Sequence, residues 1–131
     1  MIRKLSLVAV LGAVAIPAMF LAGPAAAATC SATVESTDAM KFTTASLVVP
    51  SSCKEFTVTL KHTGKLPKTV MGHNFVVGKA SDVAASKVIG GGESTTVKIP
   101  VAKLKAGEQY NFICTFPGHS SIMKGTLTLG S

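Results

Sequence analysis

Four side chains of this sequence carry donor atoms that suit a transition metal. The segment from Cys114 to Met123 offers a thiol, an imidazole five residues later at His119, and a thioether four residues beyond that. His73 offers a second imidazole directly before a predicted strand, and Gly72 beside it lets the backbone approach closely. Two imidazoles, a thiolate and a long, weak thioether are the donors of blue-copper sites, and they suit both oxidation states. We therefore predict one copper ion per chain, Cu(I) or Cu(II), held by these four side chains.

Short strands must position these donors, because the chain is rich in β-branched residues and shows no long helical period. Eight segments are predicted to be strands: Cys30–Glu35, Met40–Val49, Glu55–His62, Asn74–Val77, Ser86–Ile89, Thr95–Ile99, Gln109–Cys114 and Gly125–Leu129. Turn signals such as Thr63-Gly64 and Pro117-Gly118 separate them, and a brief helical turn is expected within residues 79–87. We predict an all-β fold, an antiparallel sandwich or barrel of about eight strands.

The thiol is predicted to lie at one end of this sandwich. Phe112 and Cys114 share one face of a strand that stops at Pro117-Gly118. A tight loop would then fold His119 and Met123 back toward the sulfur. A lone cysteine or methionine is more often core, and a lone histidine is more often structural. Three donor types at one strand end, with a second imidazole before another strand, favour a metal site over these structural roles.

The first 27 residues are predicted to be a secretory signal peptide. They combine a positive start, an apolar stretch over residues 5–21 and the small-residue run Pro24-Ala25-Ala26-Ala27. We expect cleavage after Ala27 and no membrane anchor in the processed chain. Residues 28–131 then form one domain of ordinary size.

The charge of the mature chain gives no nucleic-acid signal. Without the two basic residues of the signal, eleven basic and six acidic side chains remain, a formal charge of +5. The lysines are scattered from Lys41 to Lys124 without a cluster or stripe. Nucleic-acid binding usually needs clustered basic residues with suitable aromatics, so it is not expected. The charge supports at most a weak preference for acidic partners.

Three cysteines in an exported chain are an odd number that needs an explanation. Cys30 and Cys53 lie in the first third of the mature chain and suit a disulfide in an oxidising compartment. Cys114 is then left over, and such a thiol is prone to oxidation or mispairing unless it is buried or bound to a metal.

Four short runs also carry a family resemblance: Leu66-Pro67-Lys68, Met71-Gly72-His73-Asn74, Cys114-Thr115-Phe116-Pro117-Gly118-His119 and Met123-Lys124-Gly125-Thr126-Leu127-Thr128-Leu129. They resemble the corresponding runs of azurins, a bacterial branch of the cupredoxin family of blue-copper proteins. The resemblance covers nearly all of the mature chain. It implies a Greek-key β-sandwich or barrel of the cupredoxin type.

The resemblance also implies a role for each site residue. The cysteine and the two histidines would be strong ligands, Met123 the weak axial ligand, and the carbonyl of Gly72 a second, distant axial contact. Asn74 and the amide of Phe116 would lie outside the ligands, steadying the loop and hydrogen-bonding toward the sulfur. His62 matches a family histidine that lies close to the site without being a ligand.

Two further features follow from the same resemblance. Cys30 and Cys53 match the family disulfide. Azurins usually have a longer stretch, with a helical flap, between the first histidine ligand and the cysteine. The span from His73 to Cys114 is markedly shorter here, which argues against a helix outside the sandwich. The copper ligands themselves are unchanged.

The implied function is electron transfer in the periplasm, not enzymatic catalysis. Electrons would pass through the exposed edge of His119, inside an apolar collar made of Met40, Leu66, Val70, Met71, Pro117 and Ile122. Such a collar suits small, transient interfaces with redox proteins such as c-type cytochromes or periplasmic reductases. We expect a monomer.

Two other functions compete with this interpretation. A copper chaperone or storage protein would be expected to expose Met-rich or His-rich tracts, which this sequence lacks. An enzyme domain, such as the electron-entry module of a copper reductase, would need a second copper site, and only His62 would remain to build one. Zinc also suits the same ligands, and it would leave the protein colourless.

Overall fold

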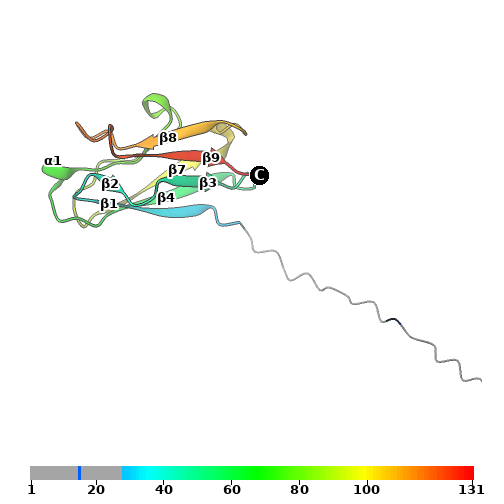
Figure 1. Cartoon of the computed structure of the whole chain (residues 1–131), viewed down its shortest axis with the longest axis horizontal. Coiled ribbons are helices and arrows are strands. Elements are labelled where there is room, and N and C mark those ends of the chain that lie inside the picture. The colour runs from blue at the N-terminus through cyan, green and yellow to red at the C-terminus, as the bar shows by residue number, and fades with distance from the viewer. Residues whose placement is uncertain (1–14, 16–27) are drawn as a thin grey trace, which may run out of the picture.

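The computed structural model describes residues 28–131 together with Ala15. Nearly all of the predicted signal peptide therefore lies outside the described residues. In the described residues, nine strands form two sheets packed face to face (Figure 1). The strands are β1 (Ser31–Thr37), β2 (Lys41–Phe42), β3 (Ser46–Val49), β4 (Glu55–His62), β5 (Val76–Val77), β6 (Ala84–Ala85), β7 (Ser94–Pro100), β8 (Gln109–Ile113) and β9 (Lys124–Leu129).

The two sheets mix parallel and antiparallel pairs. The strand order is β2-β1-β4-β7 in one sheet and β3-β9-β8-β5-β6 in the other. β1 pairs with β4, and β3 with β9, in parallel, while the remaining neighbours are antiparallel. Parallel neighbours need a long connection, and here the chain passes through the opposite sheet before it returns. The all-β sandwich is confirmed, and the expected antiparallel pairing holds for every pair of neighbouring strands except these two.

Helical structure in the described residues is limited to single turns: α1 (Lys68–Met71), the 3₁₀ turn η1 (Lys79–Ser81) and the 3₁₀ turn η2 (Val101–Lys103). α1 was not expected from the sequence. Its first carbonyl, that of Pro67, accepts the N–H groups of Val70 and Met71 at 3.0 and 2.9 Å. Pro67 is the N-cap of this turn, with an extended ψ of 158°, and its missing N–H would have no partner within the turn. The helical turn expected within residues 79–87 is confined to η1.

One predicted strand is divided between the two sheets. The segment expected as a single strand, Met40–Val49, contains β2 in the first sheet and β3 in the second. Met40 itself has a φ of 53°, in the left-handed region. A residue in this conformation turns the chain instead of extending it.

A second predicted strand, Ser86–Ile89, is not a strand. Ile89 makes only an isolated bridge with His73. The Oγ atom of Ser86 accepts the N–H of Phe75 at 2.9 Å, so a side-chain hydroxyl replaces the backbone carbonyl that a regular ladder would use. β6 lies just before this segment.

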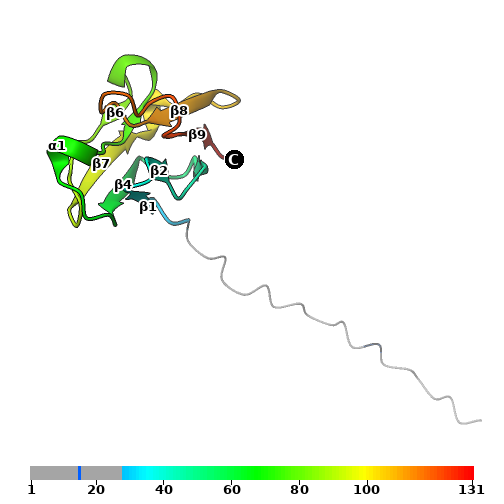
Figure 2. The same ribbon diagram turned by 60° about the vertical axis from the view of Figure 1, so that its left-hand side comes forward.

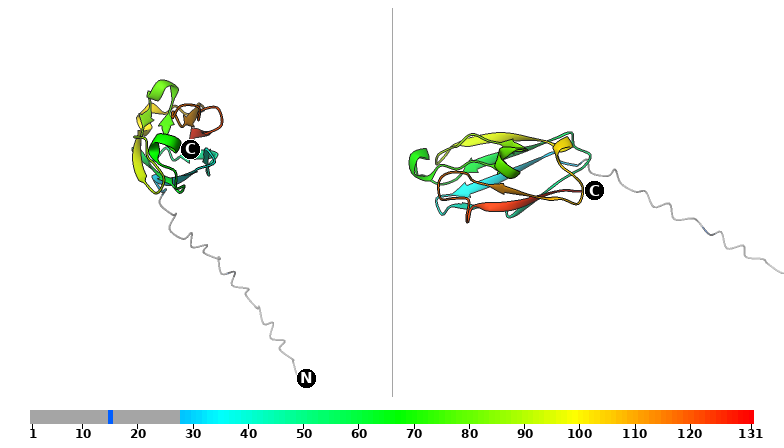
Figure 3. Two further views of the ribbon diagram at one scale, coloured as in Figure 1. Left: turned by 90° about the vertical axis from the view of Figure 1, so that its left-hand side faces the viewer. Right: turned by 90° about the horizontal axis from the view of Figure 1, so that it is seen from above.

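The core lies between the sheets and is built by alternating side chains. In β4, Phe56, Val58 and Leu60 are buried on one face, as the sequence pattern indicated. Phe42, Phe75 and Phe112 form an aromatic cluster with ring centroids 4.7 to 5.9 Å apart. Figures 2 and 3 show how the strands enclose this space from other directions. The core gives the strand ends a rigid support.

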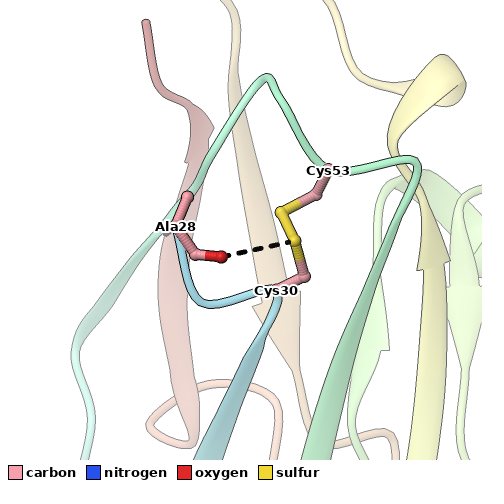
Figure 4. The surroundings of a disulfide bond; sticks show 3 residues. All are labelled: Ala28, Cys30 and Cys53. Atoms are coloured by element: carbon pink, nitrogen blue, oxygen red, sulfur yellow. Dashed lines mark hydrogen bonds between the residues drawn. A yellow bond between two sulfur atoms is a disulfide. The ribbon is translucent and has the colours of Figure 1, made fainter. Parts of the chain in front are cut away.

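Cys30 and Cys53 form a disulfide, as predicted (Figure 4). It joins the residue before β1 to the turn before β4. Figure 1 shows that β1 begins at the end of the sandwich away from α1. The disulfide therefore links two segments at one end of the sandwich. The remaining cysteine, Cys114, lies at the other end.

Candidate metal centre

The predicted metal donors meet at the end of the sandwich that carries α1. Cys114 follows the last residue of β8, and His119 and Met123 lie in the loop that leads to β9. His73 lies between α1 and β5. In Figure 1 the loop after β8 and α1 lie at the same end of the molecule, although they are distant in the sequence.

The loop from Cys114 to Met123 is folded back on itself by backbone hydrogen bonds. The N–H of His119 donates to the carbonyl of Phe116 at 3.0 Å, across a turn in which Gly118 has a φ of 82°. A positive φ at this position, after a proline, is the requirement of a type II turn. The N–H of Met123 then donates to His119 at 2.8 Å, and the N–H of Cys114 donates to Met123 at 3.1 Å. These hydrogen bonds thus bring Met123, at the end of the loop, back to Cys114 at its start.

Three side chains present metal-binding atoms to one point. Sγ of Cys114 lies 3.9 Å from Nδ1 of His73 and 3.7 Å from Nδ1 of His119. The donor atoms of all three residues lie within 4.8 Å of one another, and all three residues are buried. A Zn–S or Zn–N bond is about 2.0–2.3 Å long. Donors at this mutual spacing can therefore all reach one ion placed between them.

Hydrogen bonding fixes the proton on the ring of His73. Its Nε2 lies 2.8 Å from the backbone carbonyl of Thr37. A carbonyl can only accept, so Nε2 carries the hydrogen and Nδ1 of the neutral ring keeps its lone pair. Nδ1 is the atom that faces Cys114. The ring is thus held in the tautomer that a metal ligand needs.

Burial favours the uncharged form of all three groups in the metal-free protein. Burial lowers the pKa of His73, and a smaller opposing effect comes from its hydrogen bond to Thr37. Burial also lowers the pKa of His119. It raises the pKa of the Cys114 thiol, against the backbone N–H groups of Asn74 and Phe116, which favour the thiolate. The imidazoles are therefore ready to bind a metal, whereas the thiol must lose its proton when the ion binds.

Gly72 allows the backbone to come close to the sulfur. Its carbonyl oxygen lies 3.8 Å from Sγ of Cys114. A Cβ atom at this position would lie 2.6 Å from the carbonyl oxygen of Lys68 and 2.8 Å from the ring of Phe116, both closer than real Cβ contacts. The close approach that the sequence analysis attributed to glycine is present.

The donor set and its burial fit copper. One thiolate and two imidazoles are the strong ligands of blue-copper sites, and the buried Met123 in the same loop offers a soft thioether. No other group of three or more His, Cys, Asp or Glu side chains with this spacing was found in the part of the chain that the structure describes.

Comparison with known families gives the same result. Residues 28–130 match the model of the copper-binding proteins of the plastocyanin/azurin family. The chain belongs to this family. Azurin from Alcaligenes faecalis is 49% identical over 127 residues, which cover 78% of this chain and 99% of that protein. Azurin from Pseudomonas aeruginosa is 44% identical over 154 aligned positions, covering 98% of this chain and 99% of that protein.

A solved structure of an azurin, Az-iso2 from Methylomonas sp. strain J, superposes with a TM-score of 0.74 at 40% sequence identity. The superposition covers 79% of this chain and all of that one. Azurins are electron-transfer proteins that carry blue copper and are not enzymes. The predicted family, cupredoxin fold, copper cofactor and electron-transfer function are therefore confirmed.

Relative to its azurin relatives, this chain is short. The alignment with the Pseudomonas aeruginosa protein has 154 positions, whereas this chain has 131 residues, so the relative contains segments that this chain lacks. The location of the shortening between His73 and Cys114 stays a prediction. Within that span, all of which the structure describes, the chain forms β5, η1, β6, β7, η2 and β8 and no α-helix.

Asn74 holds the azurin-like loop through a pair of hydrogen bonds. Its Oδ1 accepts the backbone N–H of Thr115, and its Nδ2 donates to Oγ1 of Thr115, both at 2.7 Å. This pair locks the residue that follows Cys114 onto the residue that follows His73. The sequence analysis named Asn74 but missed Thr115, because the two are 41 positions apart and only the fold brings them together.

His62 supports the site without pointing a nitrogen into it. Its ring stacks on that of His73, with centroids 4.3 Å apart. Nε2 of His62 lies 2.8 Å from the carbonyl of Met71 and therefore donates to it, while Nδ1 accepts the N–H of Gly64 at 3.0 Å. With both nitrogens engaged, His62 fixes the end of α1 beside the site.

The predicted collar residues are unevenly exposed. Val70 and Ile122 are each 57% exposed and Leu66 is 38% exposed. These three are among the four large hydrophobic side chains exposed in the described residues. Pro117 is also exposed, whereas Met40 and Met71 are only partly so. Phe116 packs against His119, with ring centroids 4.7 Å apart.

Proposed function

We propose that this chain is a periplasmic carrier of single electrons on one type 1 copper ion. The observation that carries the proposal is the buried convergence of the Cys114 sulfur with the Nδ1 atoms of His73 and His119, at 3.9 and 3.7 Å. Bound copper supplies one-electron chemistry between Cu(II) and Cu(I). The protein supplies ligands, shields them from water and positions the site near a surface.

The proposed ligand roles follow from the donor atoms. Cys114 and the two histidines bind the ion strongly, Met123 is a weak axial ligand, and the carbonyl of Gly72 is a distant axial contact. The amide of Phe116 favours the thiolate form of the sulfur, and Asn74 steadies the loop. Ligands held at strand ends and by loop hydrogen bonds move little, which suits a site that changes its charge repeatedly.

His119 is the proposed contact point for electron exchange. Among the four side-chain donors it is the only one with any exposure, about 4%, because His73, Cys114 and Met123 are fully buried. Its Nε2 makes no hydrogen bond within the described residues, and no fully buried side-chain nitrogen or oxygen there lacks a partner, so this atom reaches the surface. The exposed edge is therefore small, and the collar of Met40, Leu66, Val70, Met71, Pro117 and Ile122 would bring a partner onto it.

The proposed location is the periplasm, reached through a signal peptide over residues 1–27. The disulfide between Cys30 and Cys53 supports an oxidising compartment. No helix of the described residues is long and apolar enough to span a membrane. The proposed partners are redox proteins such as c-type cytochromes or periplasmic reductases, met by a monomer through a small, transient interface.

The test is a visible spectrum with metal analysis on protein purified from its native compartment. We expect an intense blue colour and about one copper per chain, since the predicted site holds a single ion. Cys114→Ala should abolish the colour, because the thiolate is its source in the proposed site. A colourless protein loaded with zinc, or an Ala variant that keeps the blue band, would contradict the proposal.

A further inference from the structure

Five exposed lysines lie on chain segments that meet at the metal end of the sandwich, although they are scattered in the sequence. They come from five separate places in the fold, and we call them the lysine rim: Lys41, Lys65, Lys68, Lys87 and Lys124. The sequence analysis found no basic cluster because these positions span 84 residues. Only the folded chain brings them to one end.

Contacts of the neighbouring backbone locate two lysines of the rim beside His73. Lys41 pairs with Thr37, the residue whose carbonyl holds the His73 ring. The N–H of Lys65 donates to Asp38 at 2.8 Å, and Asp38 directly follows Thr37. Lys41 therefore lies on the strand next to the one that ends at Thr37, and Lys65 is bonded to the residue that follows Thr37.

The other three lysines flank the apolar collar. The backbone of Lys68, the first residue of α1, packs against Gly72, and so does the side chain of Val88, which follows Lys87. Lys124 directly follows the predicted axial ligand and begins β9. The exposed Val70 lies on the same helical turn as Lys68, and the exposed Ile122 lies two residues before Lys124.

Two carboxylates at this end, those of Asp38 and Glu93, accept hydrogen bonds from the backbone. Asp38 accepts the N–H groups of Lys65 and Leu66, and Glu93 accepts the N–H of Gly90 at 2.6 Å. No lysine of the rim makes an ion pair with a described carboxylate within 4.0 Å. Lys98, in β7, does make one, with Glu55 at 3.8 Å. The charges of the rim are thus free for an external partner.

We propose that the lysine rim selects redox partners whose own docking face has an apolar centre ringed by carboxylates. This inference rests on the proposed function, because it assumes that electrons leave at this end. Opposite charges around a small apolar contact speed encounter and set orientation, while adding modest affinity. A second copy of this chain would present the same lysines to the rim, so like charges oppose self-association through this face.

The experiment measures binding instead of electron transfer. Two c-type cytochromes serve as probes, one with a carboxylate-ringed haem edge and one with a lysine-ringed haem edge. Each is titrated into the reduced, metal-loaded protein at low and at high ionic strength, and backbone amide shifts report both the affinity and the surface. We expect the acidic cytochrome to perturb amides around Leu66, Val70 and Ile122, and its affinity to fall as salt rises.

A matched pair of variants separates the rim from the overall charge. Lys65→Gln with Lys68→Gln removes two charges at the metal end, and Lys54→Gln with Lys105→Gln removes two exposed charges from the other end. The rim variant should bind the acidic cytochrome roughly fivefold more weakly at low salt and show a flatter salt dependence. The other variant should bind nearly as the wild type does.

Equal weakening in both variants would overturn the proposal, because only the net charge would then matter. So would equal binding of the two cytochromes, or amide shifts at the end that holds the disulfide. The proposed function fails separately, through a colourless purified protein, since the binding measurement does not depend on colour or on electron flow.

Discussion

The ring of His73 donates from Nε2 to the carbonyl of Thr37, 2.8 Å away, and thereby turns an unprotonated Nδ1 toward Cys114. Thr37 ends β1, in the sheet opposite to the one that carries Cys114. A backbone carbonyl of the first sheet thus orients the Nδ1 atom of His73 toward the sulfur of Cys114, which follows a strand of the second sheet. The centre is therefore held by both layers of the sandwich.

The stability of the metal-free protein should peak between mildly acidic and mildly alkaline pH. Burial lowers the pKa values of His73 and His119 below their ordinary 6.5, so the unfolded chain takes up protons first and stability falls as the pH drops below about 6.5. Burial raises the pKa of Cys114 above its ordinary 9.0, so the unfolded chain loses that proton first and stability falls as the pH rises above about 9.0.

Thermal unfolding of the metal-free protein between pH 4 and pH 10 checks this profile. Cys114→Ala is the control, because it should remove the alkaline loss due to the thiol and keep the acid loss. An acid limb that vanishes in this variant would show that the histidines are not responsible for it.

Met123→Leu should keep copper bound and raise the reduction potential. The thioether is a weak ligand whose lone pair stabilises Cu(II) more than Cu(I), so its removal favours the reduced ion. Leu127→Met, a similar exchange at a buried position in β9, is the control and should leave the potential nearly unchanged. Cyclic voltammetry and metal analysis measure the two effects, and loss of copper from the leucine variant would refute the weak axial role.

Asn74→Ala should loosen the ligand loop, because it removes both hydrogen bonds to Thr115. The expected loss of unfolding free energy is about 1–3 kcal/mol, since each of the two hydrogen bonds contributes about 0.5–1.5 kcal/mol. Copper should also dissociate faster into a chelator. Thr115→Val removes only the hydroxyl and keeps the backbone N–H, so its effect should be smaller. Equal effects of the two substitutions would mean that the bond to the backbone N–H contributes little.

The disulfide should stabilise the fold without affecting the metal site. Replacing Cys30 and Cys53 together by alanine opens a loop closed over a sequence separation of 23 residues. The chain-entropy relation gives a loss of about 3 kcal/mol for a loop of that length. Urea unfolding measures the loss, and the visible spectrum of the copper form should stay the same, because the disulfide lies at the other end of the sandwich. A changed spectrum would show that the two ends are coupled.

The sequence predicted best where a residue's environment follows from its neighbours. The alternation of Phe56, Val58 and Leu60 placed one face of β4 in the core, and the run after β8 identified a thiol, an imidazole and a thioether in one loop. It failed at Ser86–Ile89, where the hydroxyl of Ser86 takes the place of a ladder carbonyl for Phe75. Nothing in the local pattern indicates such a substitution, because it depends on which segment lies alongside.

By itself, the sequence determined the chemistry of this protein: the donors, their softness and the family that shares them. Those properties belong to side chains and short runs, which keep their identity whatever the chain does elsewhere. The tertiary structure alone decided that β1 pairs with β4 in parallel, that Thr115 meets Asn74 and that five scattered lysines gather around the metal end. These relationships join residues that are distant along the chain, and they exist only once packing of the two sheets has fixed where each strand ends.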